Sequence, residues 1–201
     1  MTDIMERDGR FTSIRSVTTR PPRGDAHDAE YIYLTREEFQ RRLENSELAE
    51  SMTYAGDMYG TPKSELDRAH REGKIPLLVL DLNGVDAFAA LPEYSSCSVY
   101  IYESLDVIED RLYRRFLGDN PTPEGMRRFV VRKEQNIADA LILSNHADNF
   151  YAFLKNAASI RETADKVLEI FARFTEGHPA DLTANRATAE ALADEARAKQ
   201  A

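Results

Sequence analysis

The stretch Ser16-Val17-Thr18-Thr19-Arg20-Pro21-Pro22-Arg23 decides how the rest of this sequence is interpreted. It places two guanidinium groups close to three hydroxyl side chains. Each guanidinium presents a planar fork of donors that bonds phosphate oxygens in pairs, and the two prolines fix φ and hold the forks apart. The stretch therefore indicates a phosphate-binding loop. A solvated basic loop and a polyproline ligand for an adaptor domain are the alternatives that it leaves open.

The composition indicates one folded unit with a local site for an anion. With 201 residues, 42% hydrophobic and 30% charged, the chain can bury one sizeable core beside a smaller subdomain. The net charge of -9 argues against nucleic acid or an anionic membrane as the main partner, because the long-range field repels both. Cys97 is the single cysteine, and no apolar run approaches the roughly 18 residues of a membrane span. The start of the sequence has no apolar segment typical of a signal peptide, so we expect a cytoplasmic protein. We expect no structural zinc site, because the four histidines lack ligand spacing.

The first half of the chain predicts a small sheet with helices around it. Tyr31–Leu34 has the composition of a strand, and Thr35-Arg36-Glu37-Glu38 is a capping box that predicts a helix from there. Residues 48–61 predict a hairpin with tight backbone at its two glycines. A helix over about residues 63–72 is predicted to end at Gly73.

The second half predicts a parallel sheet with intervening helices. Its predicted buried strands are Ile75–Leu80, Val99–Tyr102 and Leu141–Leu143, because these apolar runs do not alternate. Ligands of open parallel sheets sit beyond the carboxyl ends of the strands, which places Asp81 and Asn145 at the site.

Helices are predicted over about residues 106–115, from Thr122-Pro123-Glu124 onward, and from the capping box at Ser159. The first two carry many arginines, which most often form a solvated face. In the third, an apolar stripe predicts core: Ile160, Val167, Leu168, Phe171 and Phe174. We expect residues 175–201 to be a helical or disordered tail without chemistry.

Several of these segments together resemble the guanylate kinase family. The matching pieces occur in the family's order over about residues 11–174: Ser16 to Arg23, Glu30-Tyr31, Glu50, Tyr59-Gly60-Thr61-Pro62 and Asp81-Leu82-Asn83-Gly84. The resemblance implies an α/β fold with a P-loop-kinase-like parallel core. It also implies an inserted mixed-sheet subdomain for GMP over about residues 16–62, and a helical lid for ATP over about residues 106–128.

The resemblance also implies roles for individual residues in the transfer of a phosphoryl group from ATP to GMP with Mg²⁺. Arg20, Arg23, Tyr31 and Tyr59 match the residues that bind the GMP phosphate, and Ser16, Glu50 and Thr61 match those that read guanine. Asp81 matches an aspartate between the two nucleotides. The lid and helix arginines that neutralise the transferring group correspond to Arg111, Arg115 and Arg128, and the adenine-side loop corresponds loosely to the segment at Asn145.

The chemistry of guanine supports the role implied for Glu50. Guanine offers N1–H and N2–H side by side, so one carboxylate accepts both. Adenine lacks this pair, and a polar site of this kind can reject the wrong base by about 10⁴-fold.

The sequence departs from the family at its beginning. A guanylate kinase opens with a strand and a glycine-rich G-x-x-x-x-G-K-[ST] loop, and nothing like it stands before Ser16. We expect a core that lacks its first strand and a chain that by itself has almost no ATP chemistry. Three hypotheses remain: a guanylate kinase whose full chain begins further upstream, a catalytically inactive module that binds GMP or a phosphorylated ligand, and a fragment that does not fold alone. Oligomeric state is not predicted.

Overall fold

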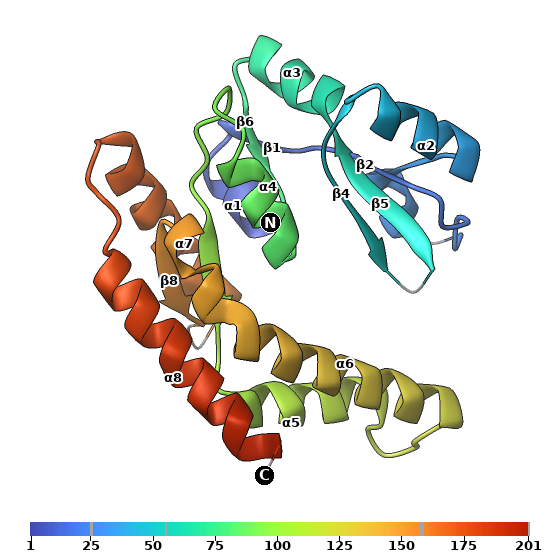
Figure 1. Ribbon diagram of the computed structural model, residues 1–201, viewed down its shortest axis with the longest axis vertical. Coiled ribbons are helices and arrows are strands. Elements are labelled where there is room, and N and C mark those ends of the chain that lie inside the picture. The colour runs from blue at the N-terminus through green and yellow to red at the C-terminus, as the bar shows by residue number, and fades with distance from the viewer. Residues whose placement is uncertain (25, 55, 157–158, 201) are drawn as a thin grey trace. The chain divides into compact units, whose positions relative to one another are not determined.

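The computed structural model describes residues 1–24, 26–54, 56–156 and 159–200, and the chain divides into two compact units, Met1–Ser96 and Cys97–Ala201 (Figure 1). Residue 55 of the predicted hairpin and residue 201 of the predicted tail lie outside the described residues. Each unit combines helices with parallel strand pairs, so the predicted α/β class is confirmed.

The first unit contains a four-stranded mixed sheet in the order β3-β2-β5-β4 and a separate parallel pair, β1 with β6. Its elements are α1 Thr2–Arg7, β1 Phe11–Ser13, β2 Ser16–Thr18, the 3-10 helix η1 Ala26–Glu30, β3 Tyr31–Tyr33, α2 Arg36–Glu44, β4 Leu48–Tyr54, β5 Asp57–Pro62, α3 Lys63–Arg71, β6 Ile75–Leu77 and α4 Leu82–Ala89.

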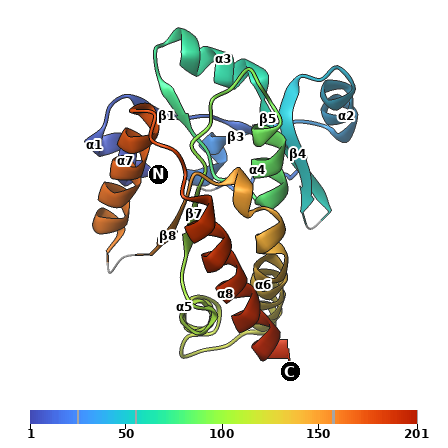
Figure 2. The same cartoon turned by 60° about the vertical axis from the view of Figure 1, so that its left-hand side comes forward.

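Alternation along β2 and β3 gives the mixed sheet one apolar face. Val17 and Phe39 are fully buried in a cluster with Leu48, to which Ile32 and Leu34 add partly buried side chains. Phe39 comes from α2, which lies beside the β4–β5 hairpin in both Figure 1 and Figure 2. The opposite face of these strands is therefore the one that carries the polar residues.

Local signals set the ends of the elements as predicted. The Thr35 hydroxyl accepts a hydrogen bond from the Glu38 amide at 3.1 Å and starts α2. Gly56 has φ +89° between β4 and β5, and Gly73 has φ +64° after α3. A residue with a side chain would be strained in either of these backbone conformations. The predicted hairpin and both helices are confirmed.

The predicted strand Ile75–Leu80 is shorter in the structure. β6 pairs in parallel with β1 in the register Phe11↔Ile75 to Ser13↔Leu77, and the pairing stops where β1 ends. Val79 beyond it is 79% exposed, which contradicts the prediction of a strand covered on both faces. An apolar run thus overstated the length of a strand whose pairing partner has only three residues.

The second unit contains the parallel pair β7 and β8 and a group of helices. Its elements are β7 Val99–Tyr102, α5 Leu105–Phe116, α6 Pro123–Ile142, the 3-10 helices η2 Leu143–Asn145 and η3 Ala147–Asn149, β8 Ala152–Lys155, α7 Ile160–Thr175 and α8 Leu182–Gln200. Thr122 and Ser159 cap α6 and α7 through hydrogen bonds to the amides of Gly125 and Glu162, as the sequence predicted.

Two predictions for this unit are wrong. Leu141–Leu143 is no strand, because it forms the end of α6 and the start of η2, and the strand that pairs with β7 is β8. A short apolar run does not distinguish a buried strand from a buried helical segment, and Leu143 is fully buried in either case. Ile160 is 81% exposed at the start of α7, so it does not belong to the core.

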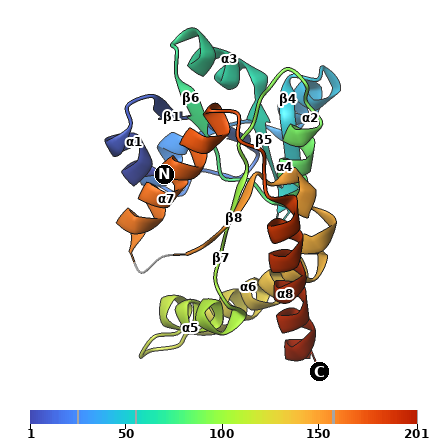
Figure 3. The same ribbon diagram turned by 90° about the vertical axis from the view of Figure 1, so that its left-hand side faces the viewer.

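The predicted tail contains a packed helix. Ala189, Ala193 and Ala196 on α8 are fully buried, and α8 contacts both α6 and α5 (Figure 3). Small side chains let helices approach closely, which explains why an alanine-rich segment is ordered here. No helix among the described residues is long and apolar enough to cross a membrane.

Candidate functional site

Strand register gathers most of the predicted site residues of the first unit on one face of the mixed sheet. Directly opposite residues share a face, as do alternate residues of one strand. In the observed register, Ser16 is paired with Tyr31, Thr18 with Tyr33 and Tyr59, and Glu50 with Thr61. The face that lies opposite the Val17 cluster therefore carries Ser16, Thr18, Tyr31, Tyr33, Glu50, Tyr59 and Thr61.

A register shift in β4 makes this arrangement possible. Leu48 pairs with Pro62 and Glu50 with Thr61, so the strand has an irregularity between them. Leu48 consequently joins the apolar cluster on one side while Glu50 belongs to the polar face. Gly60 permits the close approach of the two strands, because a Cβ there would lie 2.9 Å from the Glu50 carbonyl oxygen.

The threonine hydroxyls of the phosphate-type stretch hold the loop in place. The Arg20 amide donates to the Thr18 hydroxyl at 3.1 Å, and Thr18 is fully buried. The Met58 amide donates to the Thr19 hydroxyl at 2.9 Å, and the Thr19 amide donates to the Met58 carbonyl at 3.0 Å. These two hydroxyls thus fix the point at which Arg20 leaves the sheet.

Arg20 is the more buried of the two predicted phosphate arginines. Its side chain is only 10% exposed, and its guanidinium carbon lies 5.3 Å from the centre of the Tyr31 ring and 5.7 Å from that of Tyr33. The group donates to the Pro21 carbonyl at 2.8 Å and to the Tyr33 hydroxyl at 3.4 Å. Cation–π contacts of this kind hold an arginine in place, and a guanidinium has five N–H donors, so some remain for an anion.

Tyr31 and Tyr59 stand next to this arginine. Their ring centres are 6.2 Å apart in an edge-to-face arrangement, and they come from β3 and β5 on the two sides of β2. Arg23, in contrast, is exposed in the loop that follows the two prolines. The structure therefore brings Arg20, Tyr31 and Tyr59 together, and it places Arg23 at the edge of this group.

Asp28 is a member of this group that the sequence analysis missed. Its carboxylate accepts hydrogen bonds from the amides of Arg23 and Gly24 and from the Tyr33 hydroxyl, and it lies 3.5 Å from the Arg20 guanidinium. The Tyr33 hydrogen bond is the largest influence that lowers the pKa of Asp28, to about 2. An aspartate five residues after an arginine is too common a pattern to have identified it from sequence.

The second part of the polar face is built around Glu50. The Thr61 hydroxyl donates to the Glu50 carboxylate at 2.6 Å, and Thr61 is 1% exposed. Burial raises the pKa of Glu50, the Thr61 hydrogen bond opposes this, and the charge of Asp81 adds to the increase. A partly buried carboxylate with spare acceptor capacity can bind a ligand that offers adjacent N–H donors.

Asp81 has a structural role that is visible in the backbone. It is the N-cap residue of α4, and its carboxylate accepts a hydrogen bond from the Gly84 amide at 2.7 Å. The negative charge of Asp81 contributes to the raised pKa of Glu50. No group of three or more His, Cys, Asp or Glu side chains suited to a metal occurs within the described ranges.

The remaining predicted site residues belong to the second unit. Arg111 on α5 lies 3.8 Å from Glu103, and Arg128 on α6 donates to Glu124 at 2.8 Å. Arg115 lies over the Phe116 ring. All three arginines are exposed. Exposure is expected both for arginines on a solvated face and for arginines that contact a ligand.

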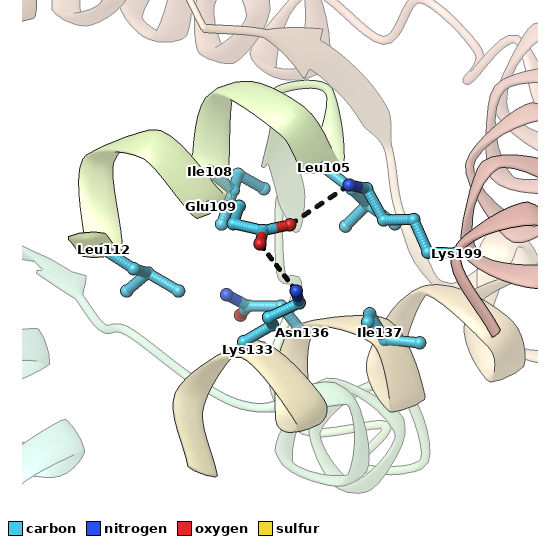
Figure 4. A pocket seen from close by; sticks show the side chains of 8 residues that line it. All are labelled: Leu105, Ile108, Glu109, Leu112, Lys133, Asn136, Ile137 and Lys199. Carbon is cyan, nitrogen blue, oxygen red and sulfur yellow. Dashed lines mark hydrogen bonds and ion pairs between the residues drawn. The ribbon is translucent and has the colours of Figure 1, made fainter. Parts of the chain in front are cut away.

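The helices that carry these arginines share an apolar cluster with α8, and one carboxylate links all three helices. Glu109 of α5 accepts hydrogen bonds from Lys133 of α6 at 2.5 Å and from Lys199 of α8 at 3.2 Å, beside a small pocket (Figure 4). The Leu105 amide at the start of α5 also donates to Glu195 of α8, at 2.7 Å. α8 therefore braces the arginine-bearing helices.

The prediction that Asn145 stands beyond the carboxyl end of a parallel strand is wrong. Asn145 is the exposed last residue of η2 and does not follow a parallel strand. The error came from the strand predicted at Leu141–Leu143, which is helical in the structure.

Comparison with known proteins identifies a family for this chain. The family model "Guanylate kinase" matches residues 3–163. Human guanylate kinase is 31% identical over 168 residues, which cover 78% of this chain and 82% of the human protein. The guanylate kinase of Chlamydia felis is 33% identical over 150 residues, which cover 73% of this chain and 72% of that protein.

The fold gives the same answer. The crystal structure of guanylate kinase from Anaplasma phagocytophilum superposes with a TM-score of 0.59 and 23% identity, and it covers 86% of this chain and 78% of that one. This likeness is consistent with a P-loop-kinase-like fold. The chain belongs to the guanylate kinase family.

Proposed function

We propose that the polar face of the mixed sheet binds GMP. The observation that carries the proposal is the presence, on one face, of a guanidinium held over two tyrosine rings and of a half-buried carboxylate bonded to Thr61. The first suits a phosphate monoester, and the second suits the N1–H and N2–H donors of guanine. Arg20, Arg23, Tyr31 and Tyr59 bind the phosphate, while Ser16, Glu50 and Thr61 contact the base.

The family supports a reaction in which ATP phosphorylates this GMP. In that reaction the exposed arginines Arg111, Arg115 and Arg128 neutralise charge on the transferring group, because phosphoryl transfer depends mainly on positioning and electrostatic stabilisation. Asp81 caps α4, which packs against the strand β4 that carries Glu50, and in this proposal it contributes at the boundary of the acceptor site. The segment at Asn145 resembles the adenine-side loop of the family, and this resemblance alone supports Asn145 as a contact for adenine.

Magnesium fits this proposal as an ion carried by the nucleotide. Mg²⁺ in kinases is held by one or two carboxylates together with substrate phosphates. Asp81 offers one such carboxylate on the first unit, although one of its oxygens already accepts a hydrogen bond from the Gly84 amide. The ion supplies charge neutralisation of the phosphates when bound.

A second candidate function is a binding module that retains the GMP site without catalysis. The observation in its favour is that the contacts proposed for the phosphate and the base all come from the first unit and require no group that holds ATP. Arg20 and Arg23 bind any phosphate monoester, so a phosphorylated peptide is also a ligand to test.

Titration calorimetry of the full chain with GMP, AMP and a phosphoserine peptide tests the binding proposal. Binding of GMP that exceeds binding of AMP is the expected result, and equal affinity for the two nucleotides would contradict the role of Glu50. A coupled assay with ATP, Mg²⁺ and GMP then separates the two functions. GDP formation supports the kinase, and GMP binding without turnover supports the binding module.

A further inference from the structure

The carboxylate of Asp28 lies at the centre of the loop that carries both predicted phosphate arginines. It accepts hydrogen bonds from the Arg23 amide at 2.9 Å and from the Gly24 amide at 2.7 Å. The Tyr33 hydroxyl donates to it as well. Asp28 therefore joins the loop backbone to a tyrosine of β3, on which Arg20 rests.

The distances indicate that Asp28 acts first on the shape of the loop. Its contacts with the two amides are hydrogen bonds of ordinary length, whereas the nearest Arg20 nitrogen is 3.5 Å away. Gly24 has φ +78°, a left-handed conformation that directs consecutive amides toward one acceptor. The exposed segment between the prolines and Gly24 thus has a tether in the ligand-free protein.

Order of this kind favours binding. A loop that already has its bound shape does not lose conformational freedom when the phosphate arrives, and this saving appears directly as affinity. The negative charge of Asp28 acts in the opposite direction, because it partly neutralises the guanidinium of Arg20. The hydrogen bonds and the charge therefore have effects of opposite sign, and they can be separated by substitution.

We propose that Asp28 is a positioning residue for phosphate binding, which holds the loop of residues 20–24 and the Tyr33 hydroxyl in the arrangement that presents Arg20 and Arg23 to a phosphate monoester. The inference rests on the proposed GMP site and names the residue that orders it. Asp28 does not itself contact the phosphate, because its carboxylate would repel it.

Three variants test this assignment by calorimetry with GMP and with guanosine, which lacks the phosphate. Asp28→Ala removes both hydrogen bonding and charge, and we expect about a tenfold or greater loss of GMP affinity with guanosine unaffected. Asp28→Asn removes the charge and keeps one acceptor oxygen for the two amides, and its NH₂ group can donate to the Tyr33 hydroxyl oxygen, so its GMP affinity should stay within about threefold of wild type or improve. Asp67→Ala, on the exposed side of α3, is the matched control and should leave the affinities for GMP and for guanosine unchanged.

The proposal is overturned if Asp28→Ala binds GMP as tightly as the wild type or more tightly, since Asp28 would then be a competitor of the phosphate. If Asp28→Ala does not fold, Tyr33→Phe replaces it, because this variant keeps the ring beneath Arg20 and removes one donor to the carboxylate. It should lose about two- to fivefold in GMP affinity, and no loss would count against the proposal.

Hydrogen exchange of the ligand-free chain distinguishes failure of this inference from failure of the GMP site. The Arg23 and Gly24 amides should exchange at least about tenfold faster in Asp28→Ala and at nearly the wild-type rate in Asp28→Asn. Unchanged exchange in Asp28→Ala would refute the tether even where GMP binds. Absence of GMP binding by the wild type, with the expected exchange pattern, would refute only the proposed function.

Discussion

Replacement of Glu50 by glutamine should have opposite effects on ligand binding and on the fold. The side chain keeps its size and one acceptor oxygen for the Thr61 hydroxyl, and it loses the negative charge and the second acceptor oxygen, which an NH₂ donor replaces. The free protein has an elevated pKa at Glu50, chiefly because of burial and further because of Asp81, so it holds this charge at a cost. A neutral residue removes that cost, and the variant should be at least as stable as the wild type.

The expected loss of GMP affinity follows from the hydrogen bonds that the charge would make. A hydrogen bond to a charged group contributes about 1.5 to 3 kcal/mol, and each 1.4 kcal/mol is about tenfold in Kd. Glu50→Gln should therefore weaken GMP binding by about 10- to 150-fold. AMP lacks the donor pair, so its weaker binding should hardly change.

The dependence on pH gives an independent check. GMP binding requires the ionised carboxylate, and the raised pKa means that affinity should begin to fall above the ordinary value of 4.5 as the pH is lowered. The contribution of Glu50 to the free energy of unfolding depends on pH in the opposite direction. The native state binds this proton more tightly than the unfolded chain does, so the contribution of Glu50 is greatest below pH 4.5 and is lost as the pH rises through the folded pKa.

Calorimetry with GMP and AMP between pH 4.5 and 8, together with thermal unfolding over the same range, measures both effects. Glu44→Gln, an exposed glutamate on α2, is the control and should follow the wild type. In Glu50→Gln, the part of the pH dependence that comes from position 50 should disappear. The reasoning is refuted if Glu50→Gln binds GMP with wild-type affinity, or if it lowers AMP affinity as much as GMP affinity.

Three further predictions concern other parts of the chain. Arg20→Ala should cost about 1.5 to 3 kcal/mol of GMP binding in calorimetry, because charge-assisted hydrogen bonds are lost, and an unchanged Kd would contradict the phosphate assignment. Gly125→Ala should lower the free energy of unfolding by about 1 to 3 kcal/mol in urea titration, since its Cβ would collide with the Phe116 carbonyl, whereas Gly9→Ala meets nothing within 4 Å and should not. Glu109→Gln should cost about 1 kcal/mol at neutral pH, and the difference should shrink in high salt and vanish as the pH falls well below 4.5, because the bonds to the two lysines in Figure 4 lower the pKa of this carboxylate.

Short-range patterns in the sequence predicted much of the fold correctly. Capping residues such as Thr35 and Ser159, and turn glycines such as Gly56, act on their immediate neighbours, so the letters alone indicate where these helices and the hairpin begin and end. The motif from Ser16 to Arg23 and the segments that follow it were also enough to identify the family. These signals depend only on residues that are close together in the sequence, so they can be recognised without a structure.

Tertiary structure decided the features that depend on distant partners. The apolar run at Leu141–Leu143 is helical because its burial comes from packing, which does not depend on the type of secondary structure. Val79 is exposed because the partner of β6 ends before it. Neither fact is encoded within the segment itself.

The same division applies to the candidate site. Sequence identified Arg20, Glu50 and Thr61 as residue types suited to a phosphate and to guanine, but register decided that they share one face of a sheet. Only the folded loop shows that the hydroxyls of Thr18 and Thr19 accept hydrogen bonds from backbone amides. It also shows that the Asp28 carboxylate lies next to the Arg20 guanidinium. The chemistry of a side chain is determined by its identity, whereas its partners are determined by how strands and loops bring distant residues within about 3 Å of one another.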